Sequence, residues 1–377
     1  MAKKKRTKQY MLFALGYWDN INDIIKEVVE VLSPVTVDFG GTATLGDNGT
    51  SMRSCNGTLM AKKGTQPNRL LLGPWRHGYN RNRALNGYSY GIGSMRDDIW
   101  LLKQQWYDYY LKGVENGVTD NIVEYFVLGT NEWRKASAWP PVEVTPQSWY
   151  FHSSGEANSH PANGNLSQEA PVGNEPTEKY SYDPKDPVQN WYSFDLMENW
   201  SDVQSFQYDF KDIEARHDVV TYTSALFEED TTIAGNIKVI LYASTDVKDT
   251  DWWVYISDVT KDNSSHRLSV GALRARFRKL EDTDYHVFGS NFETEDFLSG
   301  DISDVVRYEI SIPAIANTFK KGHRFRIAVM NAHEGYSFPN SNTGGEEGYV
   351  TETVVGAMQL HHTKAYPSHV ILPILPN

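Results

Sequence analysis

An aspartate and a histidine near the start of the chain follow apolar runs, as the acid and base of a catalytic triad do. Asp19 comes directly after the apolar, aromatic run 10–18, and His77 comes a few residues after the run 70–72. A catalytic histidine needs a carboxylate at its second ring nitrogen, which fixes the tautomer and stabilises the imidazolium. In hydrolases built on a parallel sheet the chain order is serine, acid, histidine, each at the carboxyl end of a strand. Asp19 and His77 therefore fit the last two positions of such a triad.

The same two residues also fit a structural role. Asp19 precedes residues with helical spacing and can cap that helix, and His77 can be an ordinary loop histidine. The spacing alone favours neither interpretation.

A serine that would complete the triad has no evident place. Residues 87–91, Gly-Tyr-Ser-Tyr-Gly, match the pattern Gly-x-Ser-x-Gly. A nucleophile elbow needs a hydrophobic strand directly before the serine and a helix directly after it. Residues 80–86 are polar, and Ser89 follows His77, which reverses the chain order. We therefore interpret Ser89 as a chance match.

The only cysteine, Cys55, lies in a polar segment. A single cysteine excludes an internal disulfide and a cysteine-based zinc site. A loop thiol without a catalytic role is the favoured interpretation, with a nucleophilic thiol as the alternative.

Four aspartates between two predicted strands suggest a calcium site, because Ca²⁺ prefers hard oxygen ligands. They are Asp246, Asp249, Asp251 and Asp258. Their spacing matches no EF-hand loop, so we predict a solvated turn instead.

Histidines and tryptophans in the later part of the chain favour structural roles. The histidines lack a patterned further ligand, so we expect neither a metal nor a cofactor. Core and interdomain packing is the favoured role of the tryptophans, and a sugar- or aryl-binding face is the alternative. These residues are His361, His362, His369, Trp133, Trp139, Trp149, Trp191 and Trp200.

The elements that would position the acid and the base alternate between strand and helix. The strand 10–18 leads into a helix that ends at Pro34, and residues 35–65, rich in Gly, Thr, Ser and Asn, predict a long loop or small hairpins. The next strand is 70–72.

A second helix follows this strand. Residues 94–97 match a capping box, and Asp97 and Asp98 place acid at its positive end. Apolar residues then recur at helical spacing until Gly113, which predicts a left-handed stop. The alternation indicates an α/β sheet.

Beyond residue 117 the predicted elements are strands, and no long helix is evident. Short aromatic and apolar runs divided by Gly, Pro, Asn and Asp are typical of a β-sandwich of the jelly-roll kind. Residues 153–190 predict an irregular surface excursion. The strands are predicted at 123–128, 148–152, 239–243, 252–256 and 324–329. We therefore expect two domains, a partial α/β domain at 1–117 and a jelly roll at 118–377.

The composition is that of a globular protein, with 40% hydrophobic and 22% charged residues. The net charge of −12 argues against nucleic acid or an anionic membrane as the main partner. Five Lys and Arg in the first eight residues predict a solvated basic leader. No export signal or membrane span is evident, and a cytoplasmic location is expected.

Several segments resemble the CocE/NonD family of serine hydrolases, which includes esterases, acylases and, more distantly, X-Pro dipeptidyl-peptidases. Residues 73–78, Gly-Pro-Trp-Arg-His-Gly, resemble the family motif Gly-Pro-Trp-x-His-Gly, and residues 16–19 resemble its Gly-Trp-Tyr-Asp segment with the aromatics exchanged. Further family-like segments are 109–113, 125–134, 244–246, 249–252, 268–278, 339–344 and 367–373.

The resemblance implies that Asp19 is the triad acid and His77 the general base. It also implies an α/β-hydrolase remnant followed by a galactose-binding-like jelly roll of the X-Pro dipeptidyl-peptidase type. The family's serine lies on earlier strands that have no counterpart in this sequence. The chain thus resembles the C-terminal part of an enzyme that cleaves small esters or amides, and alone we expect it to be inactive.

Two other functions fit the same residues. A jelly roll with exposed aromatics can be a non-catalytic binding module for carbohydrate or a partner chain. Alternatively the chain is one half of a split hydrolase, completed by a separate polypeptide along the open edge of its sheet. A homo-oligomer is also compatible with that edge.

Overall fold

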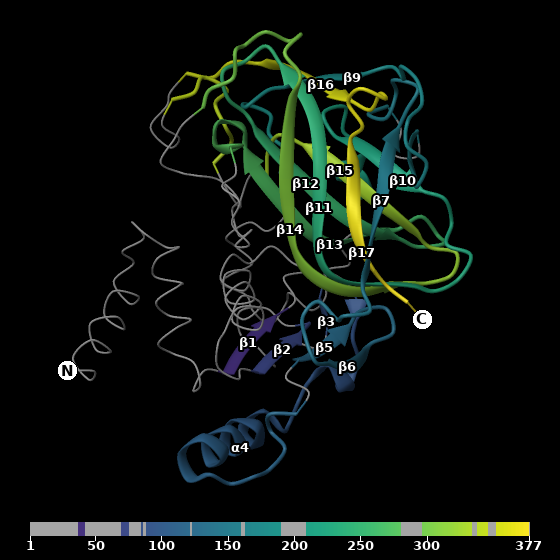
Figure 1. Ribbon diagram of the computed structural model, residues 1–377. Coiled ribbons are helices and arrows are strands. Elements are labelled where there is room, and N and C mark those ends of the chain that lie inside the picture. Colours follow the sequence, from purple (N-terminus) through teal and green to yellow (C-terminus); the bar gives the residue numbers. More distant parts are fainter. Residues whose placement is uncertain are drawn as a thin grey trace, which may run out of the picture.

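Two main sheets of different kinds, together with one sheet of two short strands, form the described part of the fold (Figure 1). The computed structural model describes residues 37–41, 69–74, 84–85, 88–120, 123–159, 163–189, 209–279, 296–333, 338–345 and 352–376. The acid-bearing strand predicted at 10–18 and the helix predicted before Pro34 lie outside these residues. The described chain is mostly strand with few helices.

The small sheet has the strand order β1-β2-β5-β6. Its strands are β1 (Val37–Gly41), β2 (Arg69–Gly73), β5 (Val123–Val127) and β6 (Glu132–Ala136). β2 runs parallel to both β1 and β5, and β6 is antiparallel to β5. Every residue of β2 and of β5 is buried, as is typical of parallel strands covered on both faces.

Two sequence predictions about this sheet are wrong. β1 lies within the segment 35–65 that we predicted as a loop or small hairpins, because its short apolar run ends in two glycines and is recognisable only through its pairing with β2. Residues 123–136, predicted as part of the β-sandwich, complete the small sheet instead. The hydrogen bonding therefore crosses residue 117, and the division into domains at that point stays a prediction.

Helix α4 (Ile99–Lys112) follows β2 as predicted. Before it come the two-residue strands β3 (Ala84–Leu85) and β4 (Tyr88–Ser89) and the 3-10 turn η1 (Ile92–Ser94). Gly113 ends α4 with a φ of 70°, the predicted left-handed stop. The predicted capping box is wrong, because the Ser94 hydroxyl donates to the Gly91 carbonyl and Asp98 is the residue that precedes the helix.

The large sheet has eleven strands and curls into two facing layers (Figure 1). The strand order is β13-β12-β15-β10-β8-β7-β17-β11-β16-β9, with β14 paired to β11. The strands are β7 (Thr145–His152), β8 (Gly164–Ser167), β9 (Glu178–Tyr182), β10 (Val220–Ser224), β11 (Thr231–Thr245), β12 (Asp251–Val259), β13 (Ser265–Arg274), β14 (Val306–Phe319), β15 (Arg324–Met330), β16 (Gly356–His361) and β17 (His369–Leu375). Two short turns of helix complete it, α6 (Lys211–Glu214) and η3 (Ala275–Phe277).

The two layers share one apolar core. Phe151 from β7, Leu241 from β11 and Ile327 from β15 belong to the same buried cluster. The layers approach closely at Gly271, where a Cβ would lie 2.5 Å from the carbonyl oxygen of Ser311. The four predicted strands from 148 to 329 are confirmed. The predicted irregular excursion 153–190 is wrong in part, because it contains β8 and β9 of this sheet.

The small sheet packs directly on the large one. Leu70, Leu72 and Tyr125 share a buried cluster with Ala316 of β14 and Leu375 of β17. Just beyond β5, the Leu128 amide donates to the Ala316 carbonyl at 3.0 Å, and the Leu128 carbonyl accepts from Thr318 at 2.8 Å. Figure 1 shows α4 on the far side of the small sheet, away from the large sheet.

Among the residues that the structure describes, no helix is long and apolar enough to cross a membrane.

Candidate functional site

The carboxyl end of β2 is the point from which the sequence predicts the catalytic histidine to emerge. β2 ends at Gly73, and the buried Pro74 follows. His77 lies three residues further on, outside the described residues, and so does Asp19. The pairing of their side chains therefore stays a prediction, whereas the structure describes β2, the strand that leads to His77.

Side chains fix β2 on both faces. Leu70 and Leu72 face the large sheet and pack in the cluster that contains Trp139. Leu71 points the other way and packs on Ile99 of α4 and on Trp133. A shift of β2 by one residue would bring the charged Arg69 to the position of a buried leucine and would exchange the side chains that pack on the two faces. The end of β2 is thus rigidly placed.

A buried network of charges fixes the beginning of β2. Arg69 forms an ion pair with the Glu124 carboxylate on β5 and donates from Nη1 to the Val118 carbonyl at 2.7 Å. The other Glu124 oxygen, Oε2, accepts from Arg96 Nη1 at 2.7 Å. Arg96 also donates from Nε to Asp98 at 2.7 Å, next to the start of α4. One carboxylate therefore joins β2, β5 and the helix.

The charges of this network stabilise the ionised form of Glu124. Burial by itself would raise the pKa of the Glu124 carboxyl, but the hydrogen bond from Arg96 and the charges of Arg96 and Arg69 hold that pKa below its usual value. Sequence reasoning missed this network. The signal was an acid inside the apolar run 123–127, since a buried glutamate needs a cationic partner.

Ser89 is not placed as a nucleophile. It is exposed and lies in β4, which pairs with β3 in a short hairpin. Its hydroxyl accepts from the Gly91 amide at 3.4 Å, and its carbonyl accepts from the Asn131 side chain at 3.3 Å. Three residues of 3-10 turn follow, not a helix. The structure agrees with the interpretation of Ser89 as a chance match.

The comparison with known families supplies the context for this site. Residues 116–371, more than half of the chain, match the family described as the X-Pro dipeptidyl-peptidase C-terminal non-catalytic domain. The chain belongs to this family. Cocaine esterase of Rhodococcus sp. is 28% identical over 327 residues, which cover 84% of this chain and 53% of the esterase. The chain spans about half the length of the curated relatives it matches.

Solved structures share the fold over nearly the whole chain. An aminopeptidase from a marine-sediment Thaumarchaeota archaeon matches with a TM-score of 0.75 at 22% identity, covering 96% of this chain and 58% of its own. An α-amino acid ester hydrolase has a TM-score of 0.71 at 20% identity, covering 97% and 62%. A CocE/NonD family hydrolase from Staphylococcus aureus has a TM-score of 0.60 at 18% identity, covering 90% and 54%. The resemblance to the CocE/NonD hydrolases is confirmed.

In this X-Pro dipeptidyl-peptidase-type domain, three of the family-like segments meet in one buried network. Arg274 donates to both oxygens of Asp251, from Nε at 2.7 Å and from Nη2 at 2.9 Å. Asn340 donates to Asp249 at 3.1 Å and to Asp251 at 2.9 Å. The Arg276 amide donates to Asp249 at 3.0 Å. These contacts give the motif residues a structural role, because they join β12, η3 and the loop 338–345.

The prediction of a solvated turn is wrong for three of the four aspartates, because Asp249, Asp251 and Asp258 are all buried. Asp249 is 0% exposed and Asp251 is 6% exposed, because arginines from a distant segment neutralise them, and spacing alone does not reveal such partners. Burial raises the pKa of Asp249 to about 6. Asp258 faces His323 at 2.9 Å, and Asp246 accepts from the Ala357 amide at 2.8 Å. No group of three or more His, Cys, Asp or Glu among the described residues is arranged to hold a metal.

The three histidines near the end of the domain have structural contacts. His361 Nε2 lies 2.9 Å from the Ser244 hydroxyl, and His369 Nδ1 lies 2.7 Å from the Pro367 carbonyl oxygen. The His362 side chain is fully buried, with Nε2 3.9 Å from Glu175. Burial lowers the pKa of all three, that of His361 to about 4.

Three of the tryptophans singled out from the sequence lie within the described residues, and each packs in or against an apolar cluster, as favoured from the sequence. Trp139 is 2% exposed and packs on Tyr125 at a ring distance of 5.2 Å. Trp133 packs on Phe126 at 5.5 Å, and Trp149 packs on Phe227 at 6.1 Å. Three other residues named from the sequence lie outside the described residues: Cys55, Trp191 and Trp200.

Proposed function

We propose that this chain is the C-terminal portion of a serine hydrolase that cleaves small esters or amides through an acyl-serine intermediate. Asp19 is the triad acid, and it orients His77 and stabilises its imidazolium form. His77 is the general base that takes the proton of the attacking serine and returns it to the leaving group. The serine comes from a portion of polypeptide outside these 377 residues. In the split-enzyme alternative that serine belongs to a separate polypeptide, and in the binding-module alternative the chain takes no part in catalysis.

The placement of β2 is the observation that carries the proposal. β2 is a buried strand in a parallel arrangement, it ends four residues before His77, and it is packed on a domain whose family description is non-catalytic. A histidine that follows such a strand is set on a rigid support. Catalysis needs that rigidity, because a catalytic base must be held within hydrogen-bond reach of its partner.

This placement gives the two sheets different roles in the proposal. The large sheet supplies the apolar surface on which the small sheet is built, through Ala316 and Leu375. By this proposal the segment before β1 supplies the acid, and the segment that follows β2 supplies the base. Removal of one triad member already lowers the rate by several orders of magnitude, so the chain alone is inactive by this proposal.

A fluorophosphonate probe, which labels activated serines, tests the proposal. The full chain alone should show no labelling and no turnover of p-nitrophenyl esters or of X-Pro anilides. Fusion of the chain to the product of the coding sequence immediately upstream should restore both, with the label on the added portion, whereas restoration by that product as a separate polypeptide would support the split enzyme. His77→Ala and Asp19→Asn should abolish the restored turnover, while Ser89→Ala should leave it unchanged.

Two results would contradict the proposal. Labelling of the isolated chain at Ser89 would make that serine the nucleophile. Restored turnover that persists in His77→Ala would show that the base lies elsewhere. Absence of labelling in both preparations would favour the binding module.

A further inference from the structure

Helix α4 has large apolar side chains on two of its sides, and only one of these sides is buried. Ile99 is 3% exposed and packs on β2, and Trp106 is 0% exposed. In contrast, Trp100 is 75%, Tyr107 is 46% and Leu111 is 70% exposed. A surface helix normally has polar side chains wherever it does not pack on a core. The apolar surface of α4 is therefore larger than the part that the small sheet covers.

The three exposed side chains form one stripe along a flank of α4, here called the flank stripe. Successive residues of an α-helix lie about 100° apart around its axis. Trp100 and Tyr107 each come directly after a buried residue, so both lie to the side of the buried face. Leu111 follows Tyr107 by four residues and lies on the same flank. The Lys103 ammonium lies 4.5 Å from the centre of the Trp100 ring and still leaves most of that ring exposed.

The outward side of α4, opposite the small sheet, is mostly polar. Asp108 comes nine residues after Ile99, half a turn round the axis, and pairs with Lys112 at 2.5 Å. Gln104 beside them is exposed. Leu101 is the one apolar residue of this side and is 53% exposed. Because the outward side suits water, a partner of the flank stripe approaches from the side of the helix.

A partner at that flank lies in the same layer as α4. Helices lie side by side on the faces of parallel sheets, and neighbouring helices pack with their axes about 8–10 Å apart. Figure 1 shows α4 on the side of the small sheet that faces away from the large sheet. The other α-helix of the described chain, α6, packs with β12 and β15 instead. The flank stripe therefore has the form of one half of a helix–helix contact.

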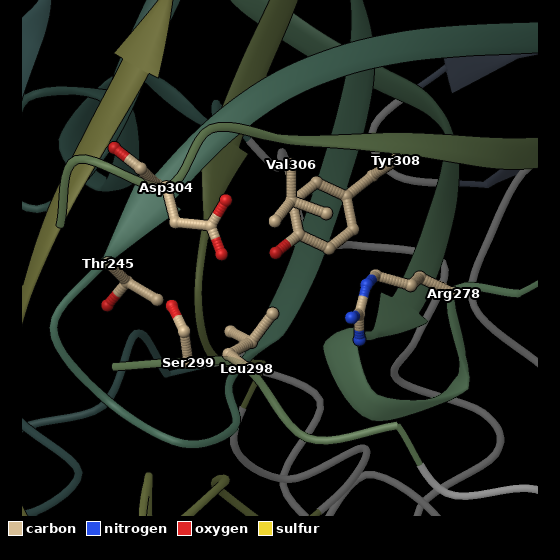
Figure 2. A pocket seen from close by; sticks show the side chains of 8 residues that line it. Thr245, Arg278, Leu298, Ser299, Asp304, Val306 and Tyr308 are labelled. Atoms are coloured by element: carbon tan, nitrogen blue, oxygen red, sulfur yellow. The ribbon is translucent and has the colours of Figure 1, made fainter. Parts of the chain in front are cut away.

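A small-molecule ligand finds little room elsewhere in the described part of the chain. A polar pocket lies at the ends of β11 and β14, between Thr245, Asp304 and Tyr308 (Figure 2). Its volume of about 20 Å³ is room for one water molecule. Exposed apolar surface, in contrast, marks sites where proteins associate. The flank stripe is thus the better candidate for binding a partner.

The length of the relatives indicates what covers the flank stripe. The chain covers 53% of cocaine esterase and 58% of the archaeal aminopeptidase, so both relatives have further polypeptide beyond the matched part. Residues 116–371 match a domain described as C-terminal, so further polypeptide is expected on the other side of it. By the proposed function that polypeptide carries the nucleophilic serine.

We propose that the flank stripe of α4 docks an amphipathic helix of this serine-bearing portion. The contact places the two portions of the α/β domain side by side in one helix layer. The inference rests on the proposed function for the identity of the partner. The place of the contact rests on the exposed side chains of α4.

Hydrogen exchange of α4, measured by mass spectrometry, tests the proposal. It compares the full chain alone with the fusion of this chain to the product of the coding sequence immediately upstream. The amides of residues 99–112 should exchange at least about tenfold more slowly in the fusion, because burial of the flank stripe stabilises the helix against opening. Trp100→Ser and Leu111→Ser should each remove most of this protection, since a serine cannot replace the apolar contact.

Leu101→Ser is the matched control, because Leu101 is an exposed leucine of the same helix on its outward side. It should leave the protection of α4 in the fusion unchanged. In the isolated chain Trp100→Ser, Leu111→Ser and Leu101→Ser should all leave the melting temperature nearly unchanged, since the three side chains are exposed there. Side chains that only stabilised the isolated chain would not give this combination.

The outcomes separate this inference from the proposed function. Protection of α4 in a fusion that shows no labelling and no turnover would support the contact and contradict the proposed activity. Equally fast exchange of α4 in the two proteins would overturn the contact, and the proposed function would still stand if turnover is restored. Protection that survives Trp100→Ser and Leu111→Ser would also overturn it. A dimer of the isolated chain that Leu111→Ser dissociates, measured by light scattering, would make a second copy the occupant and overturn the proposal.

Discussion

Arg96 donates a hydrogen bond to Glu124 at 2.7 Å, and this contact ties the approach to α4 to the middle of the small sheet. Glu124 also holds Arg69 at the start of β2. The Glu124 side chain is 4% exposed and those of Arg96 and Arg69 are 13% and 7% exposed, so the two cations share one buried anion. The strand that leads to His77 is therefore held by this charge network as well as by its pairing with β1 and β5.

Replacement of Glu124 by alanine should destabilise β2. Glu124→Ala leaves two arginines without their shared partner, and removal of one member of a buried ion pair costs about 3–5 kcal/mol. We expect a loss of this size in the free energy of unfolding by urea, and faster amide hydrogen exchange at Leu70 and Leu71. Glu132→Ala on β6 is the matched control, because Glu132 is 49% exposed and its pair with Arg134 is worth at most about 1 kcal/mol. Equal losses of unfolding free energy in Glu124→Ala and Glu132→Ala would contradict this role of Glu124.

The buried Asp249 should give the domain a characteristic pH dependence. Its folded pKa of about 6 lies above the unfolded value of about 3.9, so the folded state binds the proton more tightly. The contribution of this group to stability is therefore full below about pH 4 and is lost as the pH rises through about 6. Asp249→Asn mimics the protonated form. The unfolding free energy of the wild type minus that of the variant should fall over this window, by at most about 1.4 kcal/mol per pH unit.

Urea titrations of both proteins across this range measure that difference. Asp212→Asn, an exposed position on α6, serves as the control substitution. A difference for Asp249 that rises with pH would mean that Arg276 dominates over burial.

Some elements of the fold and of the candidate site were predictable from the sequence, and others were not. Apolar runs located β2 and long strands of the large sheet, and helical spacing located α4, because local pattern and burial agree there. The local pattern missed β1, which is a strand only through its pairing with β2, and it placed Asp249 in solvent because Arg276 and Asn340 come from distant segments. The Asp19 and His77 candidates rest on residue type and order. Side-chain pairs such as Arg69 with Glu124 need the tertiary fold to be seen at all.

The contribution of His361 to stability should change with pH in the opposite direction to that of Asp249. Burial and the neighbouring His362 lower the pKa of His361 to about 4, below the unfolded value of about 6.5. The unfolded state binds the proton more readily, so the contribution of His361 is present above about pH 6.5 and is lost as the pH falls toward 4. His361→Gln keeps a polar side chain beside Ser244 without this titration. The stability lost between about pH 7 and about pH 5 should be smaller in the variant, as measured by urea unfolding. An identical loss in both proteins would exclude His361 as the source.

Gly129, in a family-like segment between β5 and β6, joins the two sheets and should tolerate no side chain. Its φ is 83°, and a Cβ would lie 2.2 Å from the Thr318 carbonyl oxygen, which cannot withdraw because the Thr318 amide is bonded to Leu128. Gly129→Ala should therefore cost more than about 4 kcal/mol of unfolding free energy. Gly113→Ala has a similar φ of 70° with open space around the Cβ, so it should cost only about 1–2 kcal/mol. Gly173→Ala, with open space and no left-handed φ, should stay within about 0.5 kcal/mol of the wild type. If Gly129→Ala and Gly113→Ala lose the same free energy of unfolding, the backbone conformation alone explains the cost at Gly129. The close contact between the sheets then contributes nothing to it.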